Sequence, residues 1–504
     1  MKSSILTFFL SLILGTTLAH GATVVINPGQ SIQTAIDASS AGDILFVSDG
    51  IYPENLVVDN KAIEIRGQGD NRPRVYGLTI RNLPSGTFRL SNFLVNDIPN
   101  RQITLNGVNQ AVFDKVTALD FNASSSVLTI LNSSITAGGI FLDRSSLTVR
   151  NSSISGGSVE SSHGLDDSGN PLSVNLIDSN FTNNAFLKGN VFVKNSNFDW
   201  ALQIDRGNLK LLKSTVTKSV LVNHPTDAKG DTTQCIILQS TIEEKLTTKA
   251  AQSFVCYNNI RYGYFEGNVD ITGNTFYGRS GTLIGLDLNG TSTTAEIKNN
   301  RISNYTVHQH SASNACIGIR VTGGAKANIL NNLIWDCRDT HGTGANINVG
   351  MGIYVVSDTG TKIMGNIVYN CHGNGGNQTG GNRLVRAPET VILSYNNLWK
   401  ISNSVNAALV ADGVINLNAI NADPKLNSDK NLQSNSPCIN KGPPDARFND
   451  RDGSRNDIGM FGGHNFIPNG KTTNKPIVLG LDVAPVFVPI GGTTTIESTG
   501  ATVK

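Results

Sequence analysis

The chain has 504 residues, and its 40 lysine and arginine residues against 38 aspartate and glutamate residues give a formal net charge of +2. That balance argues against a nucleic-acid-binding protein, which concentrates positive charge on its binding surface. Charged residues make up 15% and hydrophobic residues 39% of the chain, so it can build a core and lacks the composition of a disordered chain.

The chain begins with a segment typical of a secretion signal, which we place at residues 1–21. Lys2 provides a basic start, and the apolar run ILTFFLSLIL at 5–14 has the length of a signal-peptide core but is too short to span a bilayer. Small residues at Ala19 and Ala22 indicate cleavage between them. We therefore expect an exported protein, extracellular or at the cell surface, with no transmembrane segment.

One short helix is expected after the signal. Ile32, Ala35 and Ile36 fall on one helical face, and Ser31 is a suitable N-cap. Helical periodicity is nearly absent from the rest of the chain, so its core is expected to come from strands.

A short phrase returns through the body of the chain. Each copy follows a strand-like apolar stretch and runs from a polar residue, often asparagine, to an aliphatic or aromatic residue. The copies are NSSI at 132–135 and 151–154, DSNF at 178–181, NSNF at 195–198, KSTV at 213–216, QSTI at 239–242, YNNI at 257–260, GNTF at 273–276, NNRI at 299–302 and NNLI at 331–334. Their spacing varies from 16 to 32 residues, as expected for a solenoid with a small fixed unit and variable insertions.

The unit itself favours β-structure. Its short strands are rich in Val, Ile, Thr and Phe and are broken by Gly, Asn and Ser. A single coil of such strands cannot bury its apolar face, but stacked coils bury a continuous core. Asparagine at the bends tolerates left-handed backbone, and its amide can hydrogen-bond to an asparagine one coil away. An array of β-sandwich domains would show boundaries about every 100 residues, and none is visible.

Two segments carry a resemblance to a known superfamily. The segment at 24–69 contains the expected helix and a G-x-Y-x-E phrase formed by Gly50, Tyr52 and Glu54, and it resembles the N-terminal capping region of right-handed parallel β-helix proteins of the pectin-lyase-like superfamily. The segment at 436–463, which begins SPCINKG and ends IGMFGG, resembles the closing motif of many secreted bacterial β-helix proteins.

This resemblance implies an all-β protein with a single right-handed parallel β-helix, or β-solenoid, at 22–465. An N-terminal helix cap would precede the coils, and a short C-terminal β tail would follow at 466–504. The tail resembles the first two strands of a bacterial immunoglobulin-like surface module, and a β-hairpin packed on the last coil is the alternative. Because this fold occurs in lyases, hydrolases, esterases, epimerases and non-enzymatic adhesins, it does not imply one activity.

Catalytic signatures of the superfamily are missing. The polygalacturonase set is not present, although Asp166 and Asp167 follow His163 and Gly164. No clear pectin-methylesterase set is visible, and the Asp-Pro-His motif of alginate epimerases is absent. Candidate residues must therefore be sought in the stacking of the coils.

Three coils carry the related phrases IGLD, IGIR and MGIY, which end at Asp287, Arg320 and Tyr354. If these strands pair in register, the three side chains stack about 4.8 Å apart, and alternation turns them outward. The loops of the same coils carry His308, His310, His341 and His372, with Arg338 close to His341. The alignment predicts a stack of charged, tyrosine and histidine side chains on these coils.

These residue types suit a lyase that acts on an acidic polysaccharide. Such an enzyme needs a cation to neutralise the substrate carboxylate and a base to remove the adjacent proton. The predicted catalytic residues are Arg320 or Arg338 as the cation and His341 or Tyr354 as the base, with Asp287, His308, His310 and His372 binding substrate. The alternative is an ordinary surface, with a solvated Asp–Arg ion pair and histidines bonded to backbone groups.

Ca²⁺ replaces arginine in many such lyases, and it needs several oxygen ligands. The available carboxylates near the stack are Asp287, Asp336, Asp339 and Asp358, but they form no compact cluster in the sequence. A second Ca²⁺ candidate is a D-x-D-G loop with Asp450, Asp452 and Asp457, which lacks the bidentate glutamate of an EF-hand. The alternative there is an Asp-rich turn in which Gly453 supplies positive φ.

The six cysteines suit an oxidising compartment, where disulfides persist. Cys337 and Cys371 each lie five residues after a bend asparagine, one coil apart, so they are predicted to form a disulfide. Cys235 and Cys256 are also about one coil apart, but their phases differ. Free buried thiols are the alternative.

The sequence is compatible with two functions. The first is a secreted, monomeric enzyme that cleaves an acidic polysaccharide, with Ca²⁺ as its only candidate cofactor. The second is a non-catalytic extracellular β-helix protein, an adhesin or matrix protein that binds a cell-surface glycan.

Overall fold

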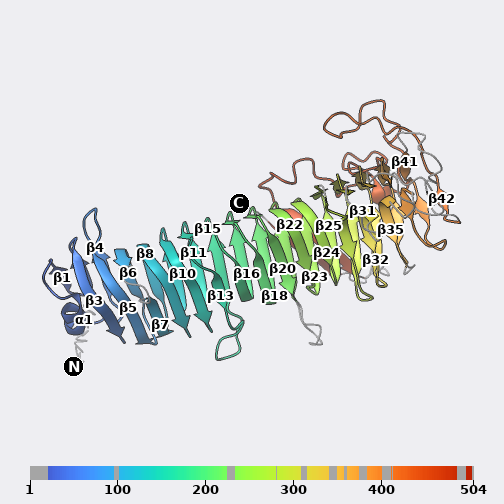
Figure 1. Cartoon of the computed structure of the whole chain (residues 1–504). Coiled ribbons are helices and arrows are strands. Elements are labelled where there is room, and N and C mark those ends of the chain that lie inside the picture. The colour runs from blue at the N-terminus through green and yellow to red at the C-terminus, as the bar shows by residue number, and fades with distance from the viewer. Residues whose placement is uncertain are drawn as a thin grey trace, which may run out of the picture.

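The computed structural model describes residues 21–95, 102–223, 233–279, 281–307, 315–339, 349–356, 360–373, 383–399, 410, 413–484 and 495–501. Within them, 39 strands join into one sheet whose pairings are all parallel, and it winds into a long solenoid (Figure 1). The predicted parallel β-helix is therefore confirmed. The signal segment lies almost wholly outside the described residues.

Each coil contributes to three rows of strands. The first row contains β3 (Ile51–Asp59), β5 (Arg74–Leu83), β7 (Ile103–Val108), β8 (Ala111–Ser124), β10 (Ser134–Asp143), β13 (Val159–Ser161), β16 (Ala185–Lys194), β18 (Leu202–Leu212), β20 (Ser219–Asn223), β22 (Thr241–Thr248), β24 (Asn259–Phe265), β27 (Ile284–Leu288), β31 (Ala315–Val321), β35 (Val349–Val355) and β39 (Val385–Arg386). Long strands such as β8, β16 and β18 bend and take part in a second row as well.

The second row adds β1 (Thr23–Ile26), β2 (Ile44–Val47), β4 (Glu64–Gly67), β6 (Phe88–Val95), β9 (Val127–Leu131), β11 (Ser146–Arg150), β14 (Ser173–Ile177), β21 (Gln234–Leu238), β23 (Gln252–Cys256), β25 (Asn268–Thr272), β28 (Thr294–Lys298), β32 (Lys326–Leu330), β36 (Lys362–Met364), β40 (Leu393–Ser394) and β42 (Asn416–Leu417). The third adds β12 (Ser153–Ile154), β15 (Asn180–Phe181), β17 (Asn197–Phe198), β19 (Thr215–Val216), β26 (Thr275–Tyr277), β29 (Arg301–Ser303), β33 (Leu333–Trp335), β37 (Ile367–Tyr369) and β41 (Asn397–Trp399). Inward side chains of all three rows form one continuous apolar core.

The expected helix is α1 (Ile32–Ala38), at the N-terminal end of the solenoid (Figure 1). Its Ser31 N-cap accepts a hydrogen bond from the amide of Thr34. The Glu54 carboxylate accepts from the amides of Ile32 and Gln33, which explains the glutamate of the G-x-Y-x-E phrase: it satisfies the unpaired amides of the first helical turn. Ile32 is buried in the solenoid core.

The bend between the second and third rows carries a buried ladder of hydrogen-bonded side chains, as the asparagine pattern predicts. The side-chain oxygen of each ladder residue accepts a hydrogen bond from the backbone N–H of the ladder residue on the preceding coil. The ladder runs through Ser133, Ser152, Ser179, Ser196, Ser214, Ser240, Asn258, Asn274, Asn300, Asn332, Asn366 and Asn396. It changes from serine to asparagine halfway along, and all of these side chains are buried.

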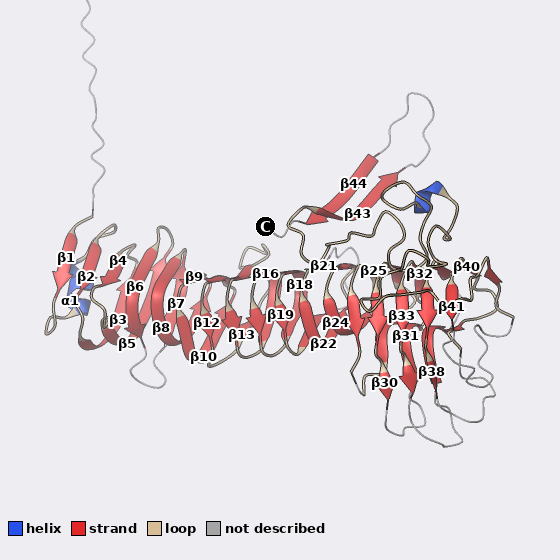
Figure 2. Ribbon diagram, turned by 90° about the horizontal axis from the view of Figure 1, so that it is seen from above, coloured by secondary structure: helices blue, strands red, loops and turns tan. Residues whose placement is uncertain are grey.

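The predicted boundary at 465 lies beyond β42, the last strand of the coils. Beyond this strand, the described chain holds the short 3₁₀ helix η1 (Ala446–Phe448) and runs back along the outside of the solenoid (Figure 2). We call residues 418–476 the return segment. Its six prolines, at Pro424, Pro437, Pro443, Pro444, Pro468 and Pro476, cannot donate to a strand ladder, which disfavours further coils in this segment.

The return segment is fixed to the bends of the coils by hydrogen bonds. Asn299 donates to the carbonyl of Met460 over 2.9 Å, and Gln239 donates to the carbonyl of Gly470 over 2.6 Å. The 436–463 motif therefore lies along the side of the solenoid, where Met460 joins an apolar cluster that includes Trp335 of the third row.

The tail forms a hairpin of β43 (Ile477–Ala484) and β44 (Thr495–Ala501), which pair antiparallel. It does not pack on the last coil, which corrects that part of the prediction. Ile477 is buried against Leu212 and Tyr257, near the middle of the solenoid. The chain's last described strand therefore lies far from its last coil (Figure 2).

The predicted disulfide is wrong, because none of the six cysteines, all of which are buried, is in a disulfide. Cys337 and Cys371 follow residues that pair in parallel register, so their side chains point the same way. Such neighbours are about 4.8 Å apart, whereas a disulfide needs a Cβ separation of about 3.8 Å. The Cys371 thiol instead lies 3.3 Å from the carbonyl oxygen of Tyr369, and burial raises the pKa of Cys337 well above its usual value.

No helix in the described part of the chain is long and apolar enough to cross a bilayer.

Candidate functional site

One ladder of outward-facing side chains follows the first row along the solenoid, and we call it the outer ladder. Strand pairing links its members in register, one from each strand, at a spacing of about 4.8 Å. They are Val57, Thr79, Thr104, Asn122, Phe141, Glu160, Phe186, Gln203, Leu221, Thr247, Tyr264, Asp287, Arg320, Tyr354 and Arg386. The predicted register of Asp287, Arg320 and Tyr354 is confirmed, and these residues belong to a much longer row.

Arg320 is held by Asp287 in a two-pronged ion pair. Its Nε and Nη2 donate to the two carboxylate oxygens over 2.9 and 2.6 Å. The Asp287 side chain is only 2% exposed, while that of Arg320 is 33% exposed. The hydrogen bonds to Asp287 raise the pKa of Arg320. The carboxylate predicted to bind substrate is therefore already engaged, and Arg320 has only part of its guanidinium available.

The Tyr262 phenol beside this pair keeps its proton at neutral pH. Burial, followed by the charge of Asp287, raises the pKa of Tyr262 to about 12. The Tyr354 ring packs under the Arg386 guanidinium, whose carbon lies 5.3 Å from the ring centroid.

The second predicted stack lies elsewhere on the same coils. A small sheet of β30 (Thr306–Val307), β34 (Arg338–Asp339) and β38 (His372–Gly373) brings Arg338 and His372 side by side. It packs against the start of β35, where a side chain at Gly350 would collide with the His372 carbonyl oxygen. Tyr354 is four residues further along that strand, so the two stacks are separate clusters. His308, His310, His341 and Asp358 lie outside the described residues.

The residues of the candidate Ca²⁺ loop are bonded to amides. The Asp450 carboxylate accepts hydrogen bonds from the backbone N–H groups of Asp457 and Gly463. The Asp452 carboxylate accepts one from the backbone N–H of Ser454. Burial raises the pKa of Asp450 to about 6. No group of three or more histidine, cysteine or acidic side chains in the described ranges is arranged to hold a metal ion.

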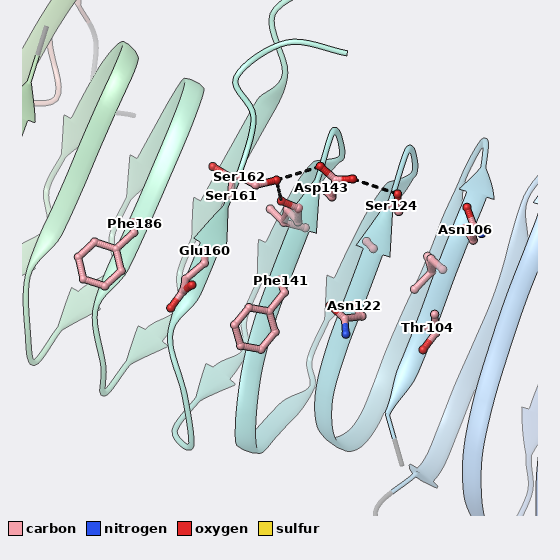
Figure 3. Close-up of a pocket in the computed structure, with 13 residues that line it drawn as sticks. Thr104, Asn106, Asn122, Ser124, Phe141, Asp143, Glu160, Ser161, Ser162 and Phe186 are labelled. Carbon is pink, nitrogen blue, oxygen red and sulfur yellow. Dashed lines mark hydrogen bonds between the residues drawn. The ribbon is translucent and has the colours of Figure 1, made fainter. Parts of the chain in front are cut away.

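The outer ladder is hollowed at its N-terminal half by a pocket of about 440 Å³, which we call the aromatic pocket (Figure 3). Phe141 and Phe186 are 37% and 39% exposed, and Glu160 lies between them in register. Polar side chains, including Thr104 and Asn122, continue the same row. Large exposed rings on outward strand positions were the sequence signal that could have revealed this pocket.

A second pocket, of about 680 Å³, adjoins the first at Ser162, and we call it the His163 pocket. It is lined by Arg144, Ser162, His163, Gly164, Leu165, Asp166, Pro171, Lys188, Gly189, Asn190, Arg206, Gly207, Asn208 and Thr233. Its basic side chains come from successive coils of the first row and its bends. The sequence names His163 only beside Asp166 and Asp167, and nothing in it reveals the basic residues around it.

Stacked parallel rows with an apolar core make the protein a parallel β-helix. No protein-family model and no curated protein matches the chain. Among solved structures it is similar to tailspike protein 3 of bacteriophage CBA120, with 12% identity and a TM-score of 0.30 over 78% of this chain. The chain spans 59% of that tailspike's length.

Two further solved structures are similar at 12% identity. One is the pectate lyase Pel9A, with a TM-score of 0.24 over 88% of this chain and 97% of the other. The other is a mannuronic acid specific polysaccharide family 6 lyase from human gut microbiota, with a TM-score of 0.26 over 81% of this chain and 93% of the other.

Proposed function

We propose that the protein binds a chain of an acidic polysaccharide along the outer ladder and cleaves it by β-elimination. The aromatic pocket is the observation that carries this proposal. Phe141 and Phe186 present exposed rings two coils apart, at a separation of about 9.6 Å along the ladder. Apolar ring faces with a few polar groups between them are what a ligand pocket offers. A repeating row of side chains suits a repeating ligand.

The basic lining of the adjoining pocket supports an acidic ligand. Three permanent cations, Arg144, Lys188 and Arg206, line it against one carboxylate, Asp166. A cation lowers the cost of forming negative charge next to a sugar carboxylate, as elimination requires. Arg320 and Tyr354 extend the same face towards the C-terminal coils.

The test uses pectate, alginate and glycosaminoglycans, each with and without Ca²⁺. Ultraviolet absorbance reports the unsaturated product, and electrophoresis through gels that contain the polymer reports binding. We expect one of the acidic polymers to give the unsaturated product and to slow the migration of the protein through the gel. Binding by Phe186→Ala should weaken about fivefold, because one aromatic contact contributes about 1 kcal/mol. Ile392→Ala removes an exposed apolar side chain elsewhere and should bind normally.

Two outcomes would count against the proposal. No retardation on any polymer would overturn it entirely. Retardation without product would overturn the cleavage and leave a non-catalytic glycan-binding protein, the alternative that the missing catalytic signatures favour.

A further inference from the structure

The His163 pocket is closed on one side by a preorganised loop at residues 163–171. A bridge between Leu165 and Pro171 joins the ends of the loop. Inside it, the Asp166 carboxylate accepts the backbone N–H groups of Ser168 and Asn170 over 2.9 and 2.8 Å. The loop thus has a defined shape that holds His163 at the pocket wall.

The three cationic side chains of the pocket differ in whether they already bind another group of the protein. Arg144 forms a 3.2 Å ion pair with Asp167, which does not line the pocket. The Lys188 ammonium donates to the carbonyl of Ser162 over 2.8 Å, which keeps it at the junction of the two pockets. Arg206 is exposed at the pocket. Lys188 and Arg206 are therefore available to an anion that enters it.

The hydrogen bonds of His163 define which ring nitrogen carries the proton. Nδ1 lies 2.8 Å from Oδ1 of Asp143, and the Ser162 hydroxyl donates to the same carboxylate oxygen over 2.9 Å. Because a carboxylate only accepts, Nδ1 of the neutral ring bears the hydrogen and Nε2 keeps its lone pair. The hydrogen bonds from Ser162 and then His163 hold the pKa of Asp143 below its usual value.

This arrangement is not a serine nucleophile with its base. In such a triad the histidine bonds the serine through one nitrogen and the carboxylate through the other. Here the Ser162 hydroxyl and the Asp143 carboxylate both lie at Nδ1 of His163. Nε2 takes part in neither contact, so it can accept a proton from another group.

We propose that the His163 pocket binds the carboxylate of a uronic acid residue through Arg206 and Lys188, and that Nε2 of His163 removes the proton next to that carboxylate. This inference rests on the proposed function and names its catalytic centre. The C5–H bond breaks and its proton passes to Nε2. The electron pair forms the C4=C5 double bond, the C4–O4 glycosidic bond breaks, and the departing oxygen takes a proton from solvent water. The neighbouring sugars occupy the aromatic pocket, which shares Ser162 with this site.

The test compares His163→Asn and Arg206→Gln with matched controls elsewhere on the surface. His464→Asn and Arg89→Gln change an exposed histidine and an exposed arginine outside both pockets. We expect His163→Asn to lower kcat at least about 100-fold with unchanged retardation, because it removes only the general base. Arg206→Gln should raise KM and weaken retardation on the acidic polymer, but not on the same polymer with its carboxyl groups reduced to alcohols. Both controls should match the wild type.

The outcomes separate the two proposals. If the wild type forms product and His163→Asn forms it equally fast, the assignment of His163 is overturned while the proposed function stands. If the wild type is retarded but forms no product, both the proposed elimination and the proposed role of His163 are overturned. If Arg206→Gln and a Lys188→Gln variant are retarded like the wild type, the pocket is not the carboxylate site. Circular dichroism melting curves would show whether each variant is folded.

Discussion

Arg320 shows how a single residue can align as predicted and still behave differently from the prediction. The IGLD and IGIR phrases correctly placed Asp287 beside it, because equal phrases stack in register. The phrases could not show that the carboxylate would be almost completely buried, since this depends on what surrounds it, including Tyr262. A buried carboxylate needs a partner, so part of the role of Arg320 is structural.

We predict that Arg320→Gln destabilises the protein by about 2 kcal/mol, because it leaves the Asp287 carboxylate buried without its cation. Urea unfolding at neutral pH measures the change. The double variant Asp287→Asn, Arg320→Gln should recover part of the loss, since it removes the buried charge as well. Equal stability of the single variant and the wild type would show that the pair is only a solvated surface contact.

At the scale of elements, the side-chain ladder at the bends ties neighbouring coils together. Asn300 accepts the backbone and side-chain N–H groups of Asn274, and it donates to the carbonyl of Ile271 and to Asn332. A ladder serine makes fewer bonds: Ser196 accepts from the amide of Ser179, and its hydroxyl donates to the carbonyls of Leu176 and Lys194. The asparagine half of the ladder therefore satisfies more buried polar groups per coil.

Asn300→Ala should accordingly cost about 3 kcal/mol of unfolding free energy, and Ser196→Ala about 1 kcal/mol. Both positions are fully buried, so the comparison isolates the number of groups left without a partner. Urea denaturation of the two variants measures the difference. A serine variant as damaging as the asparagine variant would contradict this account of the ladder.

The return segment is the element that the sequence predicted least well. Its motif at 436–463 resembles a closing motif, and the coils were therefore expected to continue to it. The prolines that disfavour further coils are visible in the sequence, but the destination of the segment is not. Some of its contacts, such as that of Lys471 with Asn259, join residues more than 200 positions apart. Local patterns carry no information about such pairs.

Lys471 gives the return segment a pH dependence. Its ammonium donates to Asn259 and Thr275, and burial, with a smaller effect of Arg301, lowers its pKa from 10.5 to about 8. Between these two pH values the unfolded chain binds more protons than the folded chain, so this group makes stability rise from pH 8 to 10.5. Melting temperatures of Lys471→Met should lack this rise, whereas the exposed control Lys475→Met should keep it. Parallel profiles for all three proteins would refute the assignment.

At the scale of the whole molecule, the fold was predictable and the site was not, for one reason. The fold depends on features that every coil repeats, so each copy of the phrase adds to the same conclusion. The site depends on which residues of unequal coils become neighbours: Asp143 and His163 are 20 positions apart, whereas Asp287 and Arg320 are 33 apart. Without a constant coil length, the outward strand positions could be aligned only through the phrases at 284–354, and the two pockets lie outside them.

The shape of the solenoid also makes a prediction about ligand length. From Thr104 on β7 to Gln203 on β18, the ladder crosses five strand spacings, or about 24 Å, and this stretch contains both pockets. Acidic oligosaccharides of increasing length should therefore bind more tightly until they reach about 24 Å and then level off. Isothermal titration calorimetry with a length series measures the plateau, and raising the salt concentration should weaken every member through screening of the cations. Affinity that continues to rise well beyond this length would instead place the chain along the whole ladder as far as Arg386.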